Sequence, residues 1–362
     1  MNTPFFQLNQ PGWHNLMPRL YTEHEGRVTS VDNRFKHVMA VALDPRTNYQ
    51  EGVIRCITSR EGDIAMKGTI DRSELHKVKG KSPEFFEIGE KLRIKNESKI
   101  IKEISSEELE CIGLEDPDIW IDKKTDLMHL YFTLPLINKN EESKSKTHLG
   151  HAVGKDLNSL EMTMPVLMAD QQGGAKELAI APVNKQGFRY SLVESADKIG
   201  NTIYSVVRFA IVEDMGEPWK FGEIAFHPAK HDIAWIAGHA SPGPLFSKNF
   251  IDVGEGKLLG IMNGCVANQE IDGKTKYGTF SIGLFIYEYE NGKIDWVSPE
   301  PFIQDSEAGK GGNRAITFAS QFVGTNPGEG ILYAHVDDSF VRAYTLKADL
   351  LKLILPTNSF NS

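Results

Sequence analysis

Apolar and polar residues alternate in short runs along most of the chain, a pattern typical of strands with one buried face. At five places two such runs flank a turn, and each place predicts a strand–turn–strand unit. These units cover residues 37–60, 118–133, 178–195, 250–266 and 315–338. Helical periodicity is nearly absent, apart from a short terminal segment at 348–355. The pattern therefore predicts an all-β protein.

The units recur at a roughly regular interval, which indicates radial repetition. Successive units from the second onward begin about 60, 72 and 65 positions apart. Further strands between the units are predicted at 147–153, 204–212, 279–289 and 339–346. Five units in this length predict a five-bladed β-propeller with four short antiparallel strands per blade. A pair of β-sandwiches would explain the strands but not the period.

No firm domain boundary interrupts this series. Residues 18–36 are polar and lack periodicity, and residues 138–146 form a charged, Ser-rich loop between two strands. We therefore predict a single domain over residues 1–362, with 1–36 as a lead-in segment.

Composition and charge limit the classes of binding partner that are expected. The formal net charge is −9 and the pI about 5.7, which disfavours nucleic acid and anionic membranes as partners. Three cysteines without a CxxC pair argue against a disulfide framework or a zinc site. The amino-terminal residues show neither a basic signal-peptide start nor a long apolar stretch, so a cytoplasmic protein is expected. The oligomeric state is left open, with a homo-oligomer as one option.

The sharpest local feature is an acidic segment, Glu115-Asp116-Pro117, immediately before a strand. Pro117 disfavours helical geometry at Asp116 and would hold this carboxylate stiffly at a strand entrance. Glycoside cleavage needs one carboxylic acid for the leaving oxygen and usually a second carboxylate. An acidic β-turn would give the same sequence, because Asp-Pro is a common turn dipeptide.

Equivalent ends of the repeated units carry polar residues, namely Thr133, Glu194, Asn263 and Asp338. In a propeller, the ends of the inner strands open into one central funnel, so residues from different blades would converge there. His239 lies in a segment with His227 and His231 around Trp235, whose ring could form the floor of a sugar subsite.

Several segments resemble motifs of glycoside hydrolase family 130, the β-mannoside phosphorylases and β-mannosidases, in the family's order. Residues 113–133 are similar to its GxEDPRI…YYMTYT signature, 176–194 to its KxxxLFP…GxYxxLH segment, and 298–301 match its SPEP. Weaker similarities occur at 147–157, 241–244, 258–264, 332–338 and 349–351, so the resemblance covers about residues 100–362. It implies a five-bladed propeller, a general acid at Asp116 and a sugar-binding carboxylate at Asp338.

Departures from the family concern mainly the positions that hold phosphate. The arginine of the EDPR motif is Asp118 here, and the resemblance places His148 at a phosphate-binding arginine position and Lys176 at the lysine. The two histidine-bearing segments have Glu194 and Asn263 instead. An acid at such a position would repel a phosphate dianion, so water becomes the expected acceptor.

We therefore predict an inverting glycosidase acting on β-mannosides or a related oligosaccharide, without metal or organic cofactor. Asp116 would be the acid and Glu194 the base, about 6.5–9.5 Å apart as inversion requires. Substrate-binding roles are expected for Glu115, Lys176, His239, Asn263 and Asp338. Two alternatives remain: a glycoside phosphorylase with an altered phosphate site, and a non-catalytic sugar-binding propeller. Purely structural explanations are also open for two of these residues: a solvated position at a hairpin end for Glu194, and a surface ion pair for Lys176.

Overall fold

The structure is a computed structural model, and it describes residues 20–66, 68–140, 144–169, 173–271, 273–310 and 314–356. Part of the expected lead-in segment and part of the 138–146 loop lie outside these residues. Within the described residues, no helix has the length and apolar character needed to cross a membrane.

Strands make up most of the regular secondary structure of the described residues, which confirms the all-β class. Leaving one single-residue parallel bridge aside, antiparallel pairing groups most described strands into five units. The first unit contains β2 (His37–Leu43), β3 (Glu51–Glu61), β4 (Ile70–Ser82) and β5 (Phe85–Lys91). The second contains β6 (Leu109–Cys111), β7 (Glu115–Ile121), β8 (Met128–Asn138), β9 (Lys146–Gly154) and β10 (Glu161–Met162).

The remaining three units follow in chain order. The third contains β11 (Lys176–Ala179), β12 (Arg189–Ile199), β13 (Thr202–Val212) and β14 (Lys220–Phe226). The fourth contains β15 (His239–Leu245), β16 (Lys257–Cys265), β19 (Phe280–Glu288) and β20 (Lys293–Val297). The fifth contains β21 (Thr317–Asn326), β22 (Glu329–Val336), β23 (Phe340–Lys347) and β1 (Tyr21–Glu23).

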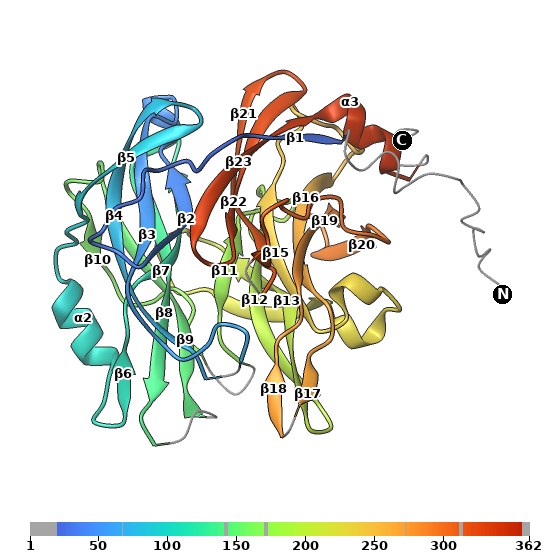
Figure 1. Ribbon diagram of the computed structural model, residues 1–362. Coiled ribbons are helices and arrows are strands. Elements are labelled where there is room, and N and C mark those ends of the chain that lie inside the picture. Colours follow the sequence, from blue (N-terminus) through green and yellow to red (C-terminus); the bar gives the residue numbers. More distant parts are fainter. Residues whose placement is uncertain are drawn as a thin grey trace.

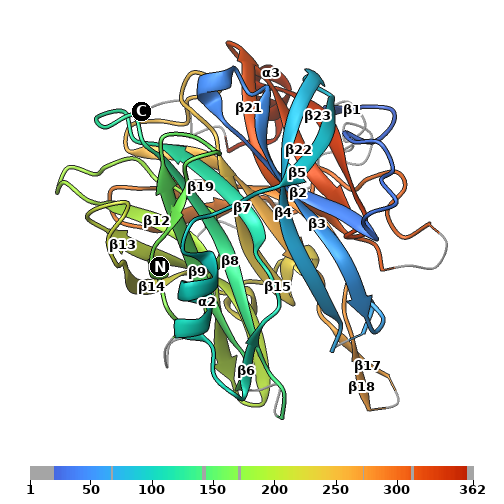
Figure 2. The same ribbon diagram turned by 90° about the vertical axis from the view of Figure 1, so that its left-hand side faces the viewer.

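If the short edge strand β6 is left aside, the first strands of the units contact one another in a closed series. Strand β2 contacts β7, β7 contacts β11, β11 contacts β15, β15 contacts β21, and β21 contacts β2. Buried apolar side chains fill the space between each pair of neighbouring units, as between the first and fifth units at Val41, Ile54, Val323 and Val341. Figure 2 shows the first unit, in blue, between the green second unit and the red fifth unit.

The two ends of the described chain meet in the fifth unit. Strand β1 pairs antiparallel with β23, with Tyr21 opposite Leu346, and runs beside it at the top of Figure 1. Part of the expected lead-in segment is thus the outer strand of the last unit. This pairing satisfies an edge that β23 would otherwise expose.

Helices lie outside the units. Helix α2 (Glu97–Ile104) packs Ile100 against the second unit, at the left of Figure 1. The expected terminal helix is α3 (Ala348–Leu351), continued by the 3₁₀ turn η7 (Lys352–Ile354). Short 3₁₀ turns are η2 (Pro45–Thr47), η4 (Pro228–Lys230) and η5 (Ala234–Ile236).

One predicted hairpin is wrong. Residues 250–253 form no strand, and β16 pairs instead with β15, a Pro- and Gly-rich segment that was not among the predicted strands. Pro242 and Pro244 have no backbone N–H, and the pairing shifts register between Pro242 and Leu245, where a bulge accommodates them. A small exposed hairpin of β17 (Gln269–Ile271) and β18 (Lys274–Lys276) projects below this unit in Figure 1.

Candidate active site

Strand irregularities bring charged side chains into one cavity. The first strand of every unit shifts register against its partner, between Met39 and Val41 in β2 and at comparable points in β7, β11, β15 and β21. Such bulges interrupt strict alternation and can re-aim a side chain. At the bulges of β7 and β11, Asp116 and Glu177 adopt left-handed backbone angles, with φ of 46° and 50°.

The cavity beside these bulges has a volume of about 380 Å³. That volume lies within the range of about 300–1,000 Å³ typical of small-ligand sites. Each unit contributes charged or titratable side chains to its wall, and these include Arg55, Glu115, Asp116, Lys176, Glu177, His239, His335 and Asp338. Apolar and aromatic residues complete the wall, among them Tyr277, Phe280, Ile316 and Phe318.

Arg55 joins the two carboxylates of the acidic segment. Its Nη1 lies 2.8 Å from Asp116 Oδ1, and its Nη2 lies 2.5 Å from Glu115 Oε1. Arg55 Nε donates to Ser73 Oγ at 2.9 Å, so β4 helps to orient the guanidinium. Burial raises the pKa of Glu115 to about 7, although Arg55 opposes the shift. The structure therefore places Glu115 and Asp116 together at the cavity, held by an arginine from the neighbouring unit.

Lys176 and His239 reach the cavity above a buried acid, Glu194. The Lys176 Nζ lies 3.2 Å from Glu194 Oε1, and the His239 Nε2 lies 3.0 Å from Glu194 Oε2. Burial alone would raise the pKa of Glu194, but His239, Lys176 and Ser241 outweigh it and lower the pKa to about 2. Burial also lowers the pKa of His239, despite the neighbouring carboxylate.

This environment disfavours the predicted base role of Glu194. The side chain is only 2% exposed and is not among the residues that line the cavity. A carboxylate with a pKa near 2 is also a weak acceptor for a proton from water. The purely structural explanations for these two residues are not fully correct either. Glu194 is buried rather than solvated at a hairpin end, and Lys176 pairs with this buried acid rather than with an acid on the surface.

Asp338 completes the polar wall from the fifth unit. It lies in the turn between β22 and β23 with φ of 44°, and its Oδ1 is 3.1 Å from His335 Nε2. Arg60 Nη2 donates to its main-chain oxygen at 3.2 Å. Burial would raise the pKa of Asp338, but the bond to His335 and the charge of Arg60 lower it to about 2. Asp338 is thus a fixed anion, suited to accepting hydrogen bonds from hydroxyl groups.

Asn263 does not reach the cavity. Its amide donates to the carbonyl oxygen of Ala319 at 3.1 Å and accepts from the Ala319 N–H at 2.8 Å. The side chain is fully buried and joins β16 to β21. The expectation that Asn263 faces the cavity is therefore wrong, because both functional groups of the amide bond to the neighbouring main chain.

The suggested aromatic floor is also wrong for Trp235. Its ring is buried between the third and fourth units, and Nε1 donates to the Ser298 carbonyl at 2.9 Å. His227 and His231 do not line the cavity either. His148 and His151 are buried, and His151 Nε2 lies 3.0 Å from His129 Nδ1. Within the described ranges, no group of three or more His, Cys, Asp or Glu side chains could hold a metal ion.

Sequence reasoning missed three charged residues of the cavity, namely Arg55, Glu177 and Arg314. Glu177 follows Lys176 directly, so its position in the second matched segment could have suggested it. Arg55 and Arg314 carried no local signal. Arg314 stacks over the rings of Tyr277 and Phe280, 4.6 and 4.8 Å from their centroids.

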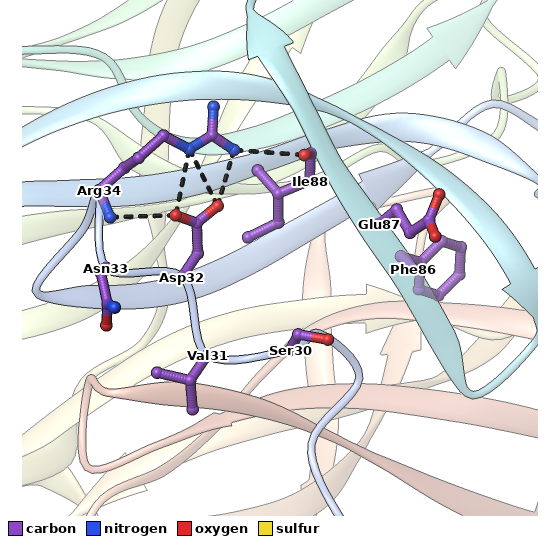
Figure 3. Close-up of a pocket in the computed structure, with 8 residues that line it drawn as sticks. All are labelled: Ser30, Val31, Asp32, Asn33, Arg34, Phe86, Glu87 and Ile88. Carbon is purple, nitrogen blue, oxygen red and sulfur yellow. Dashed lines mark hydrogen bonds and ion pairs between the residues drawn. The ribbon is translucent and has the colours of Figure 1, made fainter.

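A second, more open hollow lies on the outer face beside β5 (Figure 3). It contains one charged cluster, in which Arg34 bonds both carboxylate oxygens of Asp32 and the Ile88 carbonyl. The hydrogen bond from Arg34 lowers the pKa of Asp32. Glu87 is the other acid that lines this hollow, but Asp32 is paired with Arg34, so the hollow differs from the cavity, where several carboxylates converge.

Solved structures share this architecture. A β-1,2-mannobiose phosphorylase from Listeria innocua, in complex with β-1,2-mannobiose, is 13% identical with a TM-score of 0.61, covering 93% of this chain and 97% of its own. A second similar structure comes from work on the GH130 family of mannoside phosphorylases, which contains glycoside hydrolases that target β-1,2-mannosidic linkages in Candida mannan. It is 13% identical with a TM-score of 0.64, and the match covers 91% of this chain and 94% of its own. This chain has a GH130-like fold.

A glycosyl hydrolase from Bacteroides ovatus shares the GH130-like architecture at 16% identity and a TM-score of 0.61, covering 87% of this chain and 85% of its own. No protein-family model matches the chain, and no curated protein matches it significantly. The likeness therefore rests on three-dimensional structure, together with the order of the short motifs noted in the sequence.

Proposed function

We propose that the protein is a glycosidase that hydrolyses β-mannosides or a related oligosaccharide, on a single-domain five-bladed β-propeller. The closed series of contacts between first strands and the apolar packing between all neighbouring units support the propeller. The observation that carries the activity is the convergence of Glu115, Asp116 and Asp338, from two different units, on one cavity.

In this proposal Asp116 protonates the leaving oxygen, and the other polar groups bind the sugar. Asp338 and Glu115 accept hydrogen bonds from hydroxyl groups, while Lys176 and His239 donate to sugar oxygens. Glu194 acts through Lys176 and His239, which it fixes in position by the contacts described above. The proposed stereochemical course is inversion, in which water attacks the face of the sugar opposite the leaving group.

Water rather than phosphate is the proposed acceptor because acids surround the cations at the cavity. Lys176 is paired with Glu194, and Arg55 is paired with Glu115 and Asp116. A phosphate dianion would meet these carboxylates with its own charge uncompensated. We further propose a cytoplasmic location.

One observation favours the phosphorylase alternative. Arg314 lines the cavity and has no carboxylate partner among the residues that the structure describes. Its Nε donates to the Gly278 carbonyl at 2.7 Å, which leaves other guanidinium N–H groups for an anion. Phosphorolysis would use such a cation.

Product analysis separates the two reactions. The protein is incubated with β-1,2-mannobiose with and without inorganic phosphate, and products are resolved by chromatography and proton NMR. Hydrolysis predicts free mannose in both cases, first released as the α-anomer if inversion holds. Strong phosphate dependence with mannose 1-phosphate as product would favour the phosphorylase. Binding without turnover of any β-mannoside tested would favour the non-catalytic propeller.

The residue roles are tested by substitution. Asp116→Asn should reduce turnover by about 10²–10⁴-fold while leaving sugar binding nearly intact, because the amide keeps the shape but has no acidic proton. Lys185→Gln, at an exposed ion pair with Glu255, serves as a control and should leave turnover unchanged. Near-normal turnover of Asp116→Asn would exclude the assigned acid.

A further inference from the structure

Asp116 and Glu177 occupy corresponding bulges of neighbouring units. Each lies where the first strand of its unit shifts register, and each has a left-handed backbone conformation. For a residue other than glycine, this conformation is sterically unfavourable. Strain of this kind persists where the surrounding structure fixes it, and it clusters at functional sites. The corresponding bulge of β2 holds Ala40, also left-handed at φ 47°, so the geometry recurs but only β7 and β11 place acids there.

The two carboxyl groups meet in the cavity. Strands β7 and β11 contact each other, both side chains line the same wall, and the two carboxyl groups are placed to share a hydrogen bond. A hydrogen bond between two carboxyl groups requires a proton on one of them, because an ionised carboxylate has no donor. The pair is therefore stable in this arrangement only when it holds a proton.

The surrounding charges decide which carboxyl carries that proton. Arg55 bonds Asp116 directly at 2.8 Å, so a positive charge lies beside that carboxyl group. Glu177 faces Asp116, Glu194 and Lys176, and Lys176 is engaged by Glu194. Burial, followed by the charge of Asp116, raises the pKa of Glu177 well above its ordinary value, although Lys176 opposes the shift. The proton thus resides mainly on Glu177.

We propose that Glu177 and Asp116 share one proton and together form the general acid, with Glu177 as a second catalytic residue. This inference rests on the proposed glycosidase function. The shared proton moves from the pair to the glycosidic oxygen as the bond from that oxygen to the sugar carbon breaks, and the leaving sugar departs as an alcohol. Attacking water forms the new bond to the sugar carbon. The attacking water releases its other proton to the solvent, and the pair takes up one proton from the solvent, so the cycle is balanced.

The shared proton is tested without any substrate. Infrared spectra of the protein between pH 5 and 9 resolve protonated carboxyl groups from carboxylates. We expect a protonated carboxyl at neutral pH that disappears in Glu177→Gln and that titrates at lower pH in Asp116→Asn, since that variant lacks the neighbouring negative charge. Glu255→Gln removes an exposed carboxylate and should change only the carboxylate bands. If Glu177→Gln also removes only carboxylate signal at neutral pH, the shared proton is excluded.

Two substrates with different leaving groups test the catalytic role of Glu177. An alcohol leaving group, as in β-1,2-mannobiose, needs a proton, whereas the dinitrophenolate of 2,4-dinitrophenyl β-mannoside does not. Glu177→Gln should lose about 10²–10⁴-fold in turnover of the disaccharide and little with the activated substrate. Equal losses on both substrates, or no loss on the disaccharide, would overturn the role of Glu177. If the wild-type protein cleaves neither substrate, the proposed function fails, while the infrared result still decides the shared proton.

Discussion

Two arginine–carboxylate clusters in the first unit and its neighbour differ mainly in their surroundings. At the cavity, the Arg55 side chain is 7% exposed and bonds Glu115 and Asp116, whose side chains are 13% and 9% exposed. On the outer face, the Arg34 side chain is 52% exposed and bonds Asp32 in the adjoining turn. The same chemical groups therefore serve in a desolvated site and in water. Buried charges depend on their partners, whereas exposed ones are already solvated.

The largest expected effect comes from removing the buried arginine. Arg55→Met keeps much of the side-chain volume but leaves Glu115 and Asp116 without their cation. We expect a loss of about 3–5 kcal/mol in the free energy of unfolding, measured by urea denaturation at pH 8. The loss should be smaller at pH 5, because Glu115, with a pKa already raised to about 7, then takes up a proton. Equal losses at both pH values would mean that charge is not the cause.

Asn263, an uncharged and buried side chain, tests whether a large loss of stability requires a charged group. Asn263→Ala leaves the N–H and C=O of Ala319 without the side-chain partners that join the fourth and fifth units. We expect a loss of about 1–3 kcal/mol in stability, with no dependence on pH between 5 and 8. Asn291→Ala, which removes an exposed hydrogen bond to Glu288, is the matched control. If Asn263→Ala instead keeps full stability but binds sugar poorly, Asn263 contributes to sugar binding.

The sequence predicted the strand content and most of the repeats because alternation is a local signal. It did not predict that β15 pairs with β16, since two prolines and a glycine obscure the strand and a bulge is needed to include it. Part of the polar lead-in is the outer strand β1, a pairing that depends on the distant β23 and leaves no local pattern.

The candidate site was predicted in part. Asp116, Glu115, Lys176, His239 and Asp338 were selected from sequence, and the structure places them around one cavity. Arg55 and Glu177 were not selected, because their importance comes from contacts between units. Glu194 was selected as a base from its position at a strand end, but the sequence could not show that two neighbours cover it.

Asp118 offers the complementary case of a half-buried acid without an arginine partner. Burial raises its pKa from 3.8 to about 7. A carboxyl with a raised folded-state pKa binds its proton more tightly in the folded protein, so stability falls as pH rises from about 4 to about 7. Asp118→Asn should remove this dependence and gain on the order of 2 kcal/mol relative to the wild type between pH 5 and pH 8.

Asp32→Asn is the opposite control for Asp118→Asn. Arg34 lowers the pKa of Asp32, so the stability that Asp32 contributes is present above pH 3.8 and is lost as pH falls below it. Unfolding measured at several pH values should therefore show the two variants diverging from the wild type in opposite directions. A parallel pH dependence for both variants would contradict the assigned causes.

The smallest effect is expected at the outer cluster itself. Arg34→Met removes the bonds to Asp32 and to the Ile88 and Gly89 carbonyls, but water can replace them all because the guanidinium is largely exposed. The urea midpoint at pH 8 should therefore fall only slightly below that of the wild type, and added salt should narrow this small difference, since exposed charges are screened. Arg55→Met measured in parallel should keep its deficit in salt, because its carboxylates are buried. A loss of stability for Arg34→Met as large as that for Arg55→Met would show that burial does not explain the difference between the two clusters. The outer hollow would then have a structural role despite its exposure.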